Sequence, residues 1–243
     1  RLCRAWLALQ RGDPATAAAD LRRAVVDAPR LAEAHALLGR IMLEADLVDS
    51  GIERPAHALE LEPREPLARR DLSRGYLLIG HRAYATTMSD AERGAGEVGA
   101  WLDRARAALW QRDKAAAARH LAELPASPEP TPHELARGLL LLVAHDAPVS
   151  TSPAWRAFIE RGSSSPRRAA FAAQIEAEVA CAEGRRGDAV AALVRGVESG
   201  LGDLAWLLRC PLLTMLAGTP AYEAARAALG ARAAQVREAI YDE

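Results

Sequence analysis

Residues 12–29 read Gly-Asp-Pro-Ala-Thr-Ala-Ala-Ala-Asp-Leu-Arg-Arg-Ala-Val-Val-Asp-Ala-Pro, and this stretch decides the fold. Asp13 is a favourable N-cap, and Pro14 suits the first position of a helix. Ala17 lies five residues after Gly12, where a small side chain lets a second helix approach closely. The proline that closes the stretch ends the helix. The stretch therefore predicts a turn at Gly12 followed by a tightly packed helix.

Turn positions of this kind recur along the chain. The first three are 34 residues apart, and the fourth follows after 32 residues. A small residue lies five positions after the first, third, fourth and fifth turns. Each turn would join two antiparallel helices, so the sequence predicts a stack of helix–turn–helix units. The expected turn residues are Gly12, Asp46, Gly80, Arg112 and Gly187.

The composition favours helices throughout the chain. The 243 residues include 55 alanines and 33 leucines, and only 5% are aromatic. Alanine, leucine, arginine and glutamate, which dominate here, are the strongest helix formers. The 31 basic and 32 acidic residues give a net charge of −1, which argues against a nucleic-acid-binding protein. The longest apolar run, residues 138–144, is far shorter than the ~20 residues that a membrane helix needs. We expect neither nucleic acid nor membrane as a partner.

Each of two turns is preceded by a leucine–small pair with a large apolar residue three positions after the pair. The residues are Leu38-Gly39 with Met42, and Leu72-Ser73 with Tyr76. With the period and the alanine–proline series, these residues resemble the tetratricopeptide repeat (TPR) family. The resemblance covers 1–63, less fully 64–124, and one unit at 167–199. It implies an all-α, TPR-like α-solenoid of antiparallel helix pairs.

Residues 125–132, Pro-Ala-Ser-Pro-Glu-Pro-Thr-Pro, divide the chain. Four prolines in eight residues exclude a helix and predict a stiff connector. We expect a TPR-like array over 1–124, whose first repeat is truncated so that a segment precedes Arg1, and a C-terminal helical lobe over 133–243. Serine–proline and threonine–proline pairs act as helix starts in that lobe. The expected helices are 132–146, 153–161, 166–184, 188–199 and 220–240.

Two local features carry predictions of their own. Pro55 lies inside the expected second helix of the second unit, so that helix should start late or bend. Trp101 and Trp110 are nine residues apart, which places them on opposite sides of a helix, so we expect at most one of them in the core.

The end of the chain has apolar anchors separated by two proline turns. The anchors are Trp206, Leu212, Leu216 and Tyr222. The segment resembles the closing segment of TPR arrays at the C-terminus of bacterial signalling proteins. A terminal repeat must cover the last hydrophobic face of the stack. We expect the final helix, with Arg226, Arg232, Arg237 and Glu238, to present charge to water.

The sequence contains no recognisable catalytic or cofactor-binding motif. It has no phosphate loop, no HExxH and no GxSxG. None of the six histidines pairs with another at the i,i+3 or i,i+4 spacing of metal ligands on a helix. The three cysteines are widely spaced, which indicates reduced, buried residues rather than disulfides. We predict a cytoplasmic protein that is not an enzyme and has no cofactor or metal.

The resemblance implies a concave groove, formed by the first helix of each pair, that binds a peptide or protein. Arginine outnumbers acid there, and its guanidinium suits carboxylates or phosphorylated side chains. The alternative is ordinary surface charge, with Arg40 and Glu44 paired at i,i+4. The candidate groove residues are Glu33, Arg40, Glu44, Arg70, Arg74 and Arg106.

We therefore predict a non-catalytic protein–protein interaction scaffold whose partner is an acidic protein or peptide. One alternative is a regulatory C-terminal region of a bacterial kinase, cyclase or winged-helix regulator that binds another domain of the same polypeptide. A further alternative is an unrecognised enzyme with a site between the two lobes. A polar pocket with clustered, strongly perturbed titratable groups would favour that reading.

Overall fold

The computed structural model describes residues 1–81, 85, 98–125, 132–150, 152–162 and 164–241, and within them the protein is all-α. In the N-terminal half the helices are α1 (Leu2–Gln10), α2 (Pro14–Asp27), α3 (Ala32–Glu44), α4 (Val48–Leu61), α5 (Pro66–Leu78), α7 (Val98–Gln111) and α8 (Lys114–Glu123). In the C-terminal half they are α9 (Pro132–His145), α10 (Pro153–Gly162), α11 (Pro166–Ala182), α12 (Arg186–Glu198), α13 (Leu204–Arg209), the 3-10 helix η2 (Pro211–Leu216) and α14 (Pro220–Tyr241).

Five turns, each at the end of the first helix of a pair, share one backbone geometry, which Gly200 after α12 repeats. The turn residues Gly12, Asp46, Gly80 and Arg112 have φ of 79°, 60°, 80° and 50°. After each, the next amide donates to the carbonyl five residues before it, as Asp13 N does to Ala8 O at 3.0 Å. This bond satisfies a carbonyl that the end of the helix leaves free.

The fifth turn residue is Gly184, and the expectation of Gly187 was wrong. Gly184 has φ of 73°, and Arg185 N donates to Ala180 O at 2.8 Å, as in the other turns. Gly187 lies inside α12. The small residue five positions after this turn is Ala189, which is fully buried.

Helix starts follow the side-chain chemistry expected from the sequence. Asp13 Oδ1 accepts from Thr16 N at 3.0 Å, with Pro14 at the first helical position. Ser165 Oγ accepts from Arg168 N at 3.3 Å at the start of α11. All five helices predicted after the connector are present, with bounds that agree within a few residues. Residues 126–131 of the connector lie outside the described residues.

Helix α4 runs without interruption from Val48 to Leu61 with Pro55 inside it, so the expected late start was wrong. A proline within a helix leaves the carbonyl four residues earlier, here that of Gly51, without its usual donor. The proline ring instead packs on α3, where a Cβ added at Gly39 would lie 2.5 Å from Pro55 Cδ. Gly39 therefore makes room for the proline.

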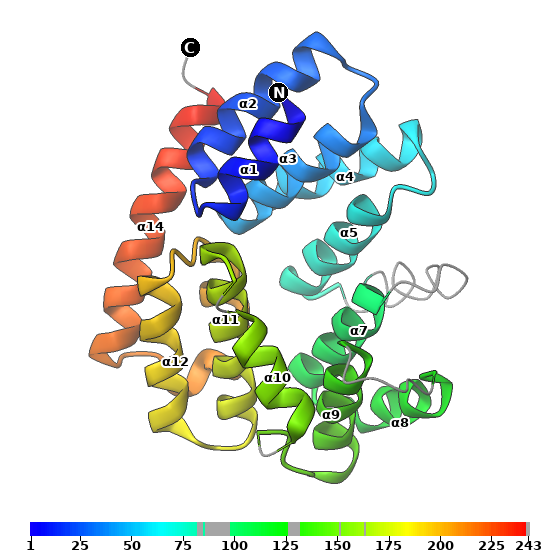
Figure 1. Ribbon diagram of the computed structural model, residues 1–243, viewed down its shortest axis with the longest axis vertical. Coiled ribbons are helices and arrows are strands. Elements are labelled where there is room, and N and C mark those ends of the chain that lie inside the picture. Colours follow the sequence, from blue (N-terminus) through cyan, green and yellow to red (C-terminus); the bar gives the residue numbers. More distant parts are fainter. Residues whose placement is uncertain (82–84, 86–97, 126–131, 151, 163, 242–243) are drawn as a thin grey trace.

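The helices follow one another around a ring (Figure 1). Each helix packs on its neighbours from α1 round to α12, and α14 packs on α12 and on α2, which brings the end of the chain against its beginning. One continuous cluster of buried apolar residues extends from Ala5 in α1 to Ile240 in α14. Contacts such as α7 with α9 and α1 with α11 join residues 1–124 to residues 133–243.

The segment after α12 lies across the ring. Helix α13 packs on α3 and α5, and η2 packs on α7, α11 and α12. Trp206 is fully buried. The segment thus contacts helices from both halves of the chain instead of covering only the last helix pair.

Within α14, Arg232 donates to Val197 O at 2.9 Å and Arg237 donates to Ala45 O at 3.2 Å. These two arginines therefore bind other parts of the protein and do not face water alone.

Both Trp101 and Trp110 are buried, which corrects the expectation that at most one would be. Helix α7 is packed on several sides, by α5, α8, α9 and η2, so opposite faces of it are covered. Arg104 lies 4.7 Å from the Trp101 ring centroid, and Arg106 lies 5.5 Å from that of Trp110.

None of the helices described is both long enough and apolar enough to cross a membrane.

Candidate functional site

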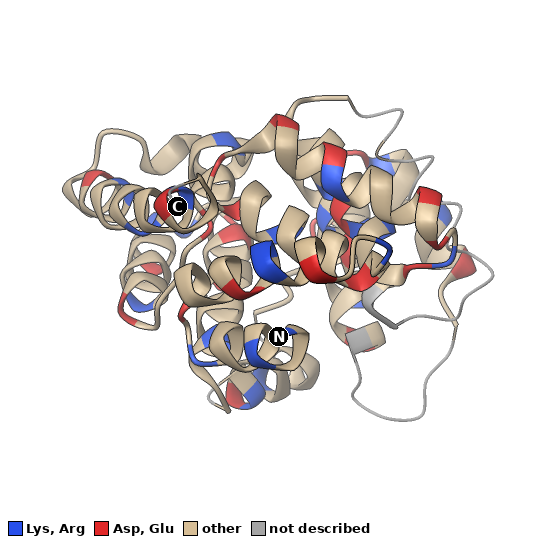
Figure 2. Ribbon diagram, turned by 90° about the horizontal axis from the view of Figure 1, so that it is seen from above, with Lys and Arg blue, Asp and Glu red and all other residues tan. Residues whose placement is uncertain are grey.

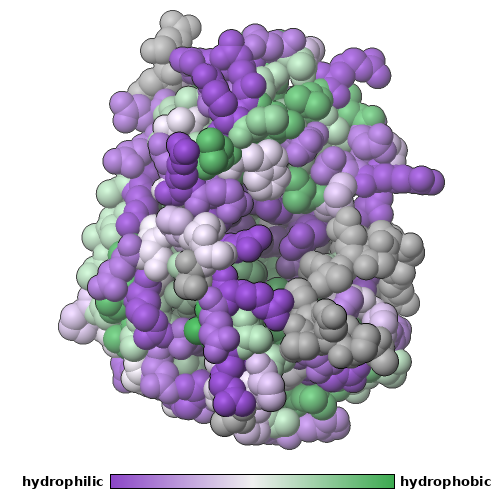
Figure 3. Space-filling model, viewed as in Figure 1, coloured by the Kyte–Doolittle hydropathy of each residue, from purple (hydrophilic) through white to green (hydrophobic). Residues whose placement is uncertain are grey.

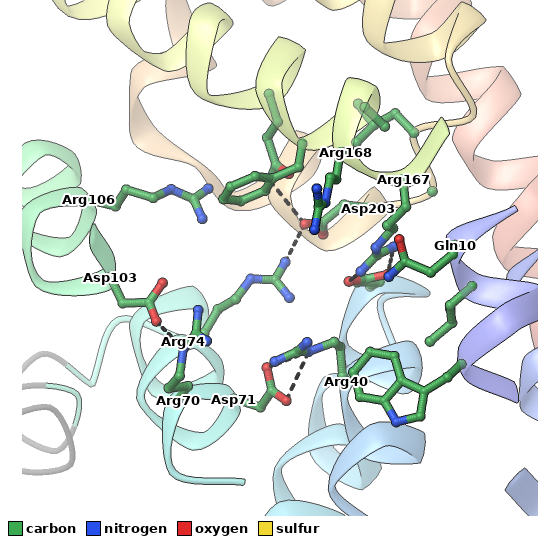
Figure 4. A pocket seen from close by; sticks show the side chains of 18 residues that line it. Gln10, Arg40, Arg70, Asp71, Arg74, Asp103, Arg106, Arg167, Arg168 and Asp203 are labelled. Atoms are coloured by element: carbon green, nitrogen blue, oxygen red, sulfur yellow. Dashed lines mark hydrogen bonds and ion pairs between the residues drawn. The ribbon is translucent and has the colours of Figure 1, made fainter. Parts of the chain in front are cut away.

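A cavity of about 270 Å³ lies among the first helices of the pairs, α1, α3, α5, α7 and α11, with residues 201–203 completing its wall. The surface is hollowed near its centre, where hydrophilic side chains gather (Figure 3). Figure 4 shows guanidinium and carboxylate groups from several helices pointing toward one another there. The charged lining residues are Arg40, Arg70, Arg74, Arg106, Arg167, Arg168, Glu44, Asp71, Asp103 and Asp203.

The turn geometry explains why these side chains meet. Counting back six residues from the five turn residues, 12, 46, 80, 112 and 184, gives one residue on each first helix. Because the helix pairs are stacked in the same way, the same position on each first helix faces the centre of the ring. Those residues are Trp6, Arg40, Arg74, Arg106 and Glu178.

Ion pairs connect the first helices to one another. Arg40 Nε of α3 lies 3.0 Å from Asp71 Oδ1 of α5. Arg106 of α7 forms a two-pronged pair with Glu178 of α11, with Nε to Oε2 at 3.0 Å and Nη2 to Oε1 at 2.5 Å. Such paired hydrogen bonds fix geometry as well as adding stability. Trp206 Nε1 also donates to Glu178, at 2.8 Å.

A further pair connects α5 to α7, and it is the most exposed of the set. Arg70 Nε lies 2.5 Å from Asp103 Oδ2. Their side chains are 30% and 28% exposed, against 9% for Arg106 and 0% for Glu178. Water therefore screens the Arg70 pair more than the Arg106 pair.

Two more pairs cross the cavity. Arg74 of α5 donates to Asp203, the N-cap of α13. Arg167 of α11 binds both carboxylate oxygens of Glu44 on α3, with Nη1 to Oε2 at 2.7 Å. These pairs hold α3 to α11 and α5 to the segment that crosses the ring.

Two of the buried carboxylates of the cavity, Glu44 and Asp71, have opposite pKa shifts. Burial favours the neutral form of Glu44, but Arg167, Arg74 and Arg40 outweigh it and hold the pKa of Glu44 below its ordinary value. At Asp71 burial outweighs Arg40, Arg74 and Arg70, so its pKa is raised. Glu44 in turn raises the pKa of Arg167.

The charges of the cavity do not cancel. Basic and acidic residues are interspersed over the helices of the whole molecule (Figure 2). In the cavity, five of the six arginines each hold one carboxylate, counting Glu178 as the partner of Arg106. Within the described part of the chain, Arg168 is bound to no carboxylate, and its guanidinium donates to Ser164 Oγ at 3.2 Å. The cluster therefore carries one positive charge in excess.

Five of the six residues expected in the groove line this cavity: Arg40, Glu44, Arg70, Arg74 and Arg106. The sixth, Glu33, accepts a hydrogen bond from Trp6 Nε1 at 3.0 Å and is not part of the lining. The alternative pairing of Arg40 with Glu44 is not what holds them, since they bind Asp71 and Arg167. That these residues bind a partner stays a prediction.

Sequence reasoning missed the acidic partners and the arginines of α11. Asp71 and Asp103 each lie nine residues before a turn residue, so the repeat could have identified them. Arg167 and Arg168 lie two and three residues after the N-cap Ser165, and nothing local places Arg167 opposite Glu44. Asp203 enters the cavity only because its segment crosses the ring.

The described residues contain no group of three or more histidine, cysteine, aspartate or glutamate side chains arranged to hold a metal ion. His35 and His57 meet edge to face, with ring centroids 4.8 Å apart. Burial is the main reason that the pKa of His35 is lowered. Cys181 and Cys210 are buried as expected, whereas Cys3 is exposed.

Comparison with known proteins found no matching family model, no similar curated protein and no similar solved structure.

Proposed function

We propose that this chain is a TPR-like interaction scaffold that binds an acidic segment of a protein partner in its arginine-lined cavity. The observation that carries the proposal is the convergence of six arginines from four helices on one cavity, with one guanidinium in excess of the carboxylates. The TPR-like reading is supported by the five equivalent turns and their spacing of 34, 34 and 32 residues over the first four.

The paired arginines keep donors for a ligand. A guanidinium has five N–H groups, and one carboxylate uses at most two of them. Arg40 binds Asp71 through Nε, and Arg74 binds Asp203 through Nη2. Both residues line the cavity, so an acidic side chain there would meet guanidinium donors that ion pairs already hold in position. Fixed donors favour tight binding because little side-chain conformational freedom is lost when the ligand binds.

The size of the cavity limits what it can hold. A volume of about 270 Å³ is slightly below the range typical of pockets for small molecules. It suits one or two acidic side chains, or one phosphorylated side chain, of a segment whose remainder lies on the rim. The excess of one positive charge favours a ligand group that brings a net negative charge. Another domain of the same polypeptide would meet these requirements as well as a separate protein.

Affinity capture from a lysate of the source organism tests the proposal with three immobilised baits. They are the native chain, Arg168→Glu, and Arg23→Glu as a control at an exposed arginine of α2 outside the cavity. Arg168→Glu keeps the fold, because Glu three residues after the N-cap Ser165 completes a capping box. We expect the native and Arg23→Glu baits to retain the same partner proteins and Arg168→Glu to lose them. Polyglutamate should displace these partners from the native bait. Recovery of the same proteins by all three baits, or of none by any, would contradict the proposal.

A further inference from the structure

A second pocket, of about 320 Å³, adjoins the charged cavity. Its wall is formed by α9, α10 and α11 and is mainly apolar, with Leu135, Ala154, Phe158 and Phe171 among its residues. The rings of Phe158 and Phe171 meet edge to face at a centroid distance of 6.2 Å, and Trp155 lies 6.1 Å from Phe158. The volume lies within the range of pockets that hold small molecules.

The charged groups of this second pocket have one sign. Arg161 and Arg168 belong to its lining, and the described lining includes no carboxylate. In the charged cavity, by contrast, carboxylates lie among the arginines of the lining. Arg168 is exposed and is hydrogen-bonded to the neutral Ser164 Oγ. A bound anion would thus meet a guanidinium whose charge no described carboxylate has neutralised.

Arg168 and Phe171 line both spaces, so they form the wall between them. They lie three residues apart on α11 and therefore share a face of that helix. The arrangement provides a position for a negative head group at Arg168 and an apolar space beside it for a tail.

We infer that this second pocket binds a small amphipathic carboxylate, with its carboxylate on Arg168 and a short aryl or alkyl tail in the apolar space that Leu135, Ala154, Phe158 and Phe171 line. The inference does not rest on the proposed function, since it concerns a free small molecule in the neighbouring space. The aromatic walls favour an aryl tail, because edge-to-face contacts add to the area that the tail buries.

Isothermal titration calorimetry with phenylbutyrate and its neutral counterpart phenylbutanol tests the inference. A charge-assisted hydrogen bond predicts that phenylbutyrate binds the native chain about tenfold or more tightly than phenylbutanol. Arg168→Gln removes the cation and should abolish that preference, whereas Arg23→Gln should preserve it. Ala154→Phe fills the apolar space and should abolish binding of both compounds.

Thermal unfolding of each variant first establishes that it is folded. Equal affinity for the two compounds in the native chain would overturn the role of Arg168. Binding of phenylbutyrate that survives both Arg168→Gln and Ala154→Phe would place the compound elsewhere, and no binding to the native chain would refute the site. Because Ala154 does not line the charged cavity, retention of protein partners by Ala154→Phe separates this inference from the proposed function.

Discussion

Replacing Arg106 with methionine removes the cation that Glu178 binds in the interior. The Glu178 side chain is fully buried, and the Arg106 side chain is 9% exposed. The substitution takes away both hydrogen bonds from the guanidinium and leaves one donor, Trp206 Nε1 at 2.8 Å. Removing one partner of a buried pair typically costs about 3–5 kcal/mol, because the remaining charge is left uncompensated. A loss of that size is a large part of the stability of an ordinary domain.

Urea denaturation followed by circular dichroism measures this loss. In the Arg106→Met background, Glu178→Gln should restore at least about 2 kcal/mol, since glutamine carries no charge and still accepts from Trp206. Arg70→Met is the matched control, because its pair with Asp103 is about one-third exposed on each side and should cost about 0–1 kcal/mol. A loss of less than about 1 kcal/mol in Arg106→Met, or equal losses for Arg106→Met and Arg70→Met, would refute the reasoning that the α7–α11 pair is desolvated.

Three further predictions concern helix packing, the pH dependence of stability, and the contact between α14 and the end of α3. Gly39→Ala places a Cβ 2.5 Å from Pro55 Cδ and should destabilise the protein by about 1–3 kcal/mol in urea titrations, whereas Gly230→Ala, in open space within α14, should stabilise it by about 0.5–1 kcal/mol. The pKa of Glu44 is lowered in the fold, so its ionised form stabilises the protein above the ordinary pKa of 4.5, and this stability is lost as the pH falls through the folded-state pKa. When the urea midpoint is plotted against pH, Glu44→Gln should therefore reduce its decline on the acid side. An unchanged decline would count against the pair of Glu44 with Arg167. Arg237→Ala removes the bond from α14 to Ala45 O and should increase amide hydrogen exchange in α14, while exchange that stays unchanged would show that this contact does not hold the helix.

The helix starts and most turns could be predicted because their chemistry is local. Asp13 with Pro14, and Ser165 with Pro166, specify helix starts within a few residues. The fifth turn was misplaced because Gly187-Asp188 imitates Gly12-Asp13 in sequence. Only the backbone distinguishes the two glycines, since it is Gly184 that has the positive φ.

Part of the candidate site depends on contacts between residues that are far apart in the sequence. Arg167 and Glu44 are 123 residues apart, and they meet only because α11 comes to lie against the first helices. Burial of both Trp101 and Trp110 likewise requires that α7 be covered on opposite faces. By contrast, Arg40, Arg74 and Arg106 occupy one repeated position, and for that reason spacing alone could place them on a common surface.

Selection from a random linear peptide library on the immobilised native chain tests the central claim most directly. The claim is that the cavity arginines recognise acidic segments, and the readout is the amino-acid composition of the selected peptides. We expect enrichment of aspartate and glutamate with the native chain and with Arg23→Glu, and loss of that enrichment with Arg168→Glu. Selected peptides without acidic enrichment, or the same enrichment with Arg168→Glu as with the native chain, would contradict the account.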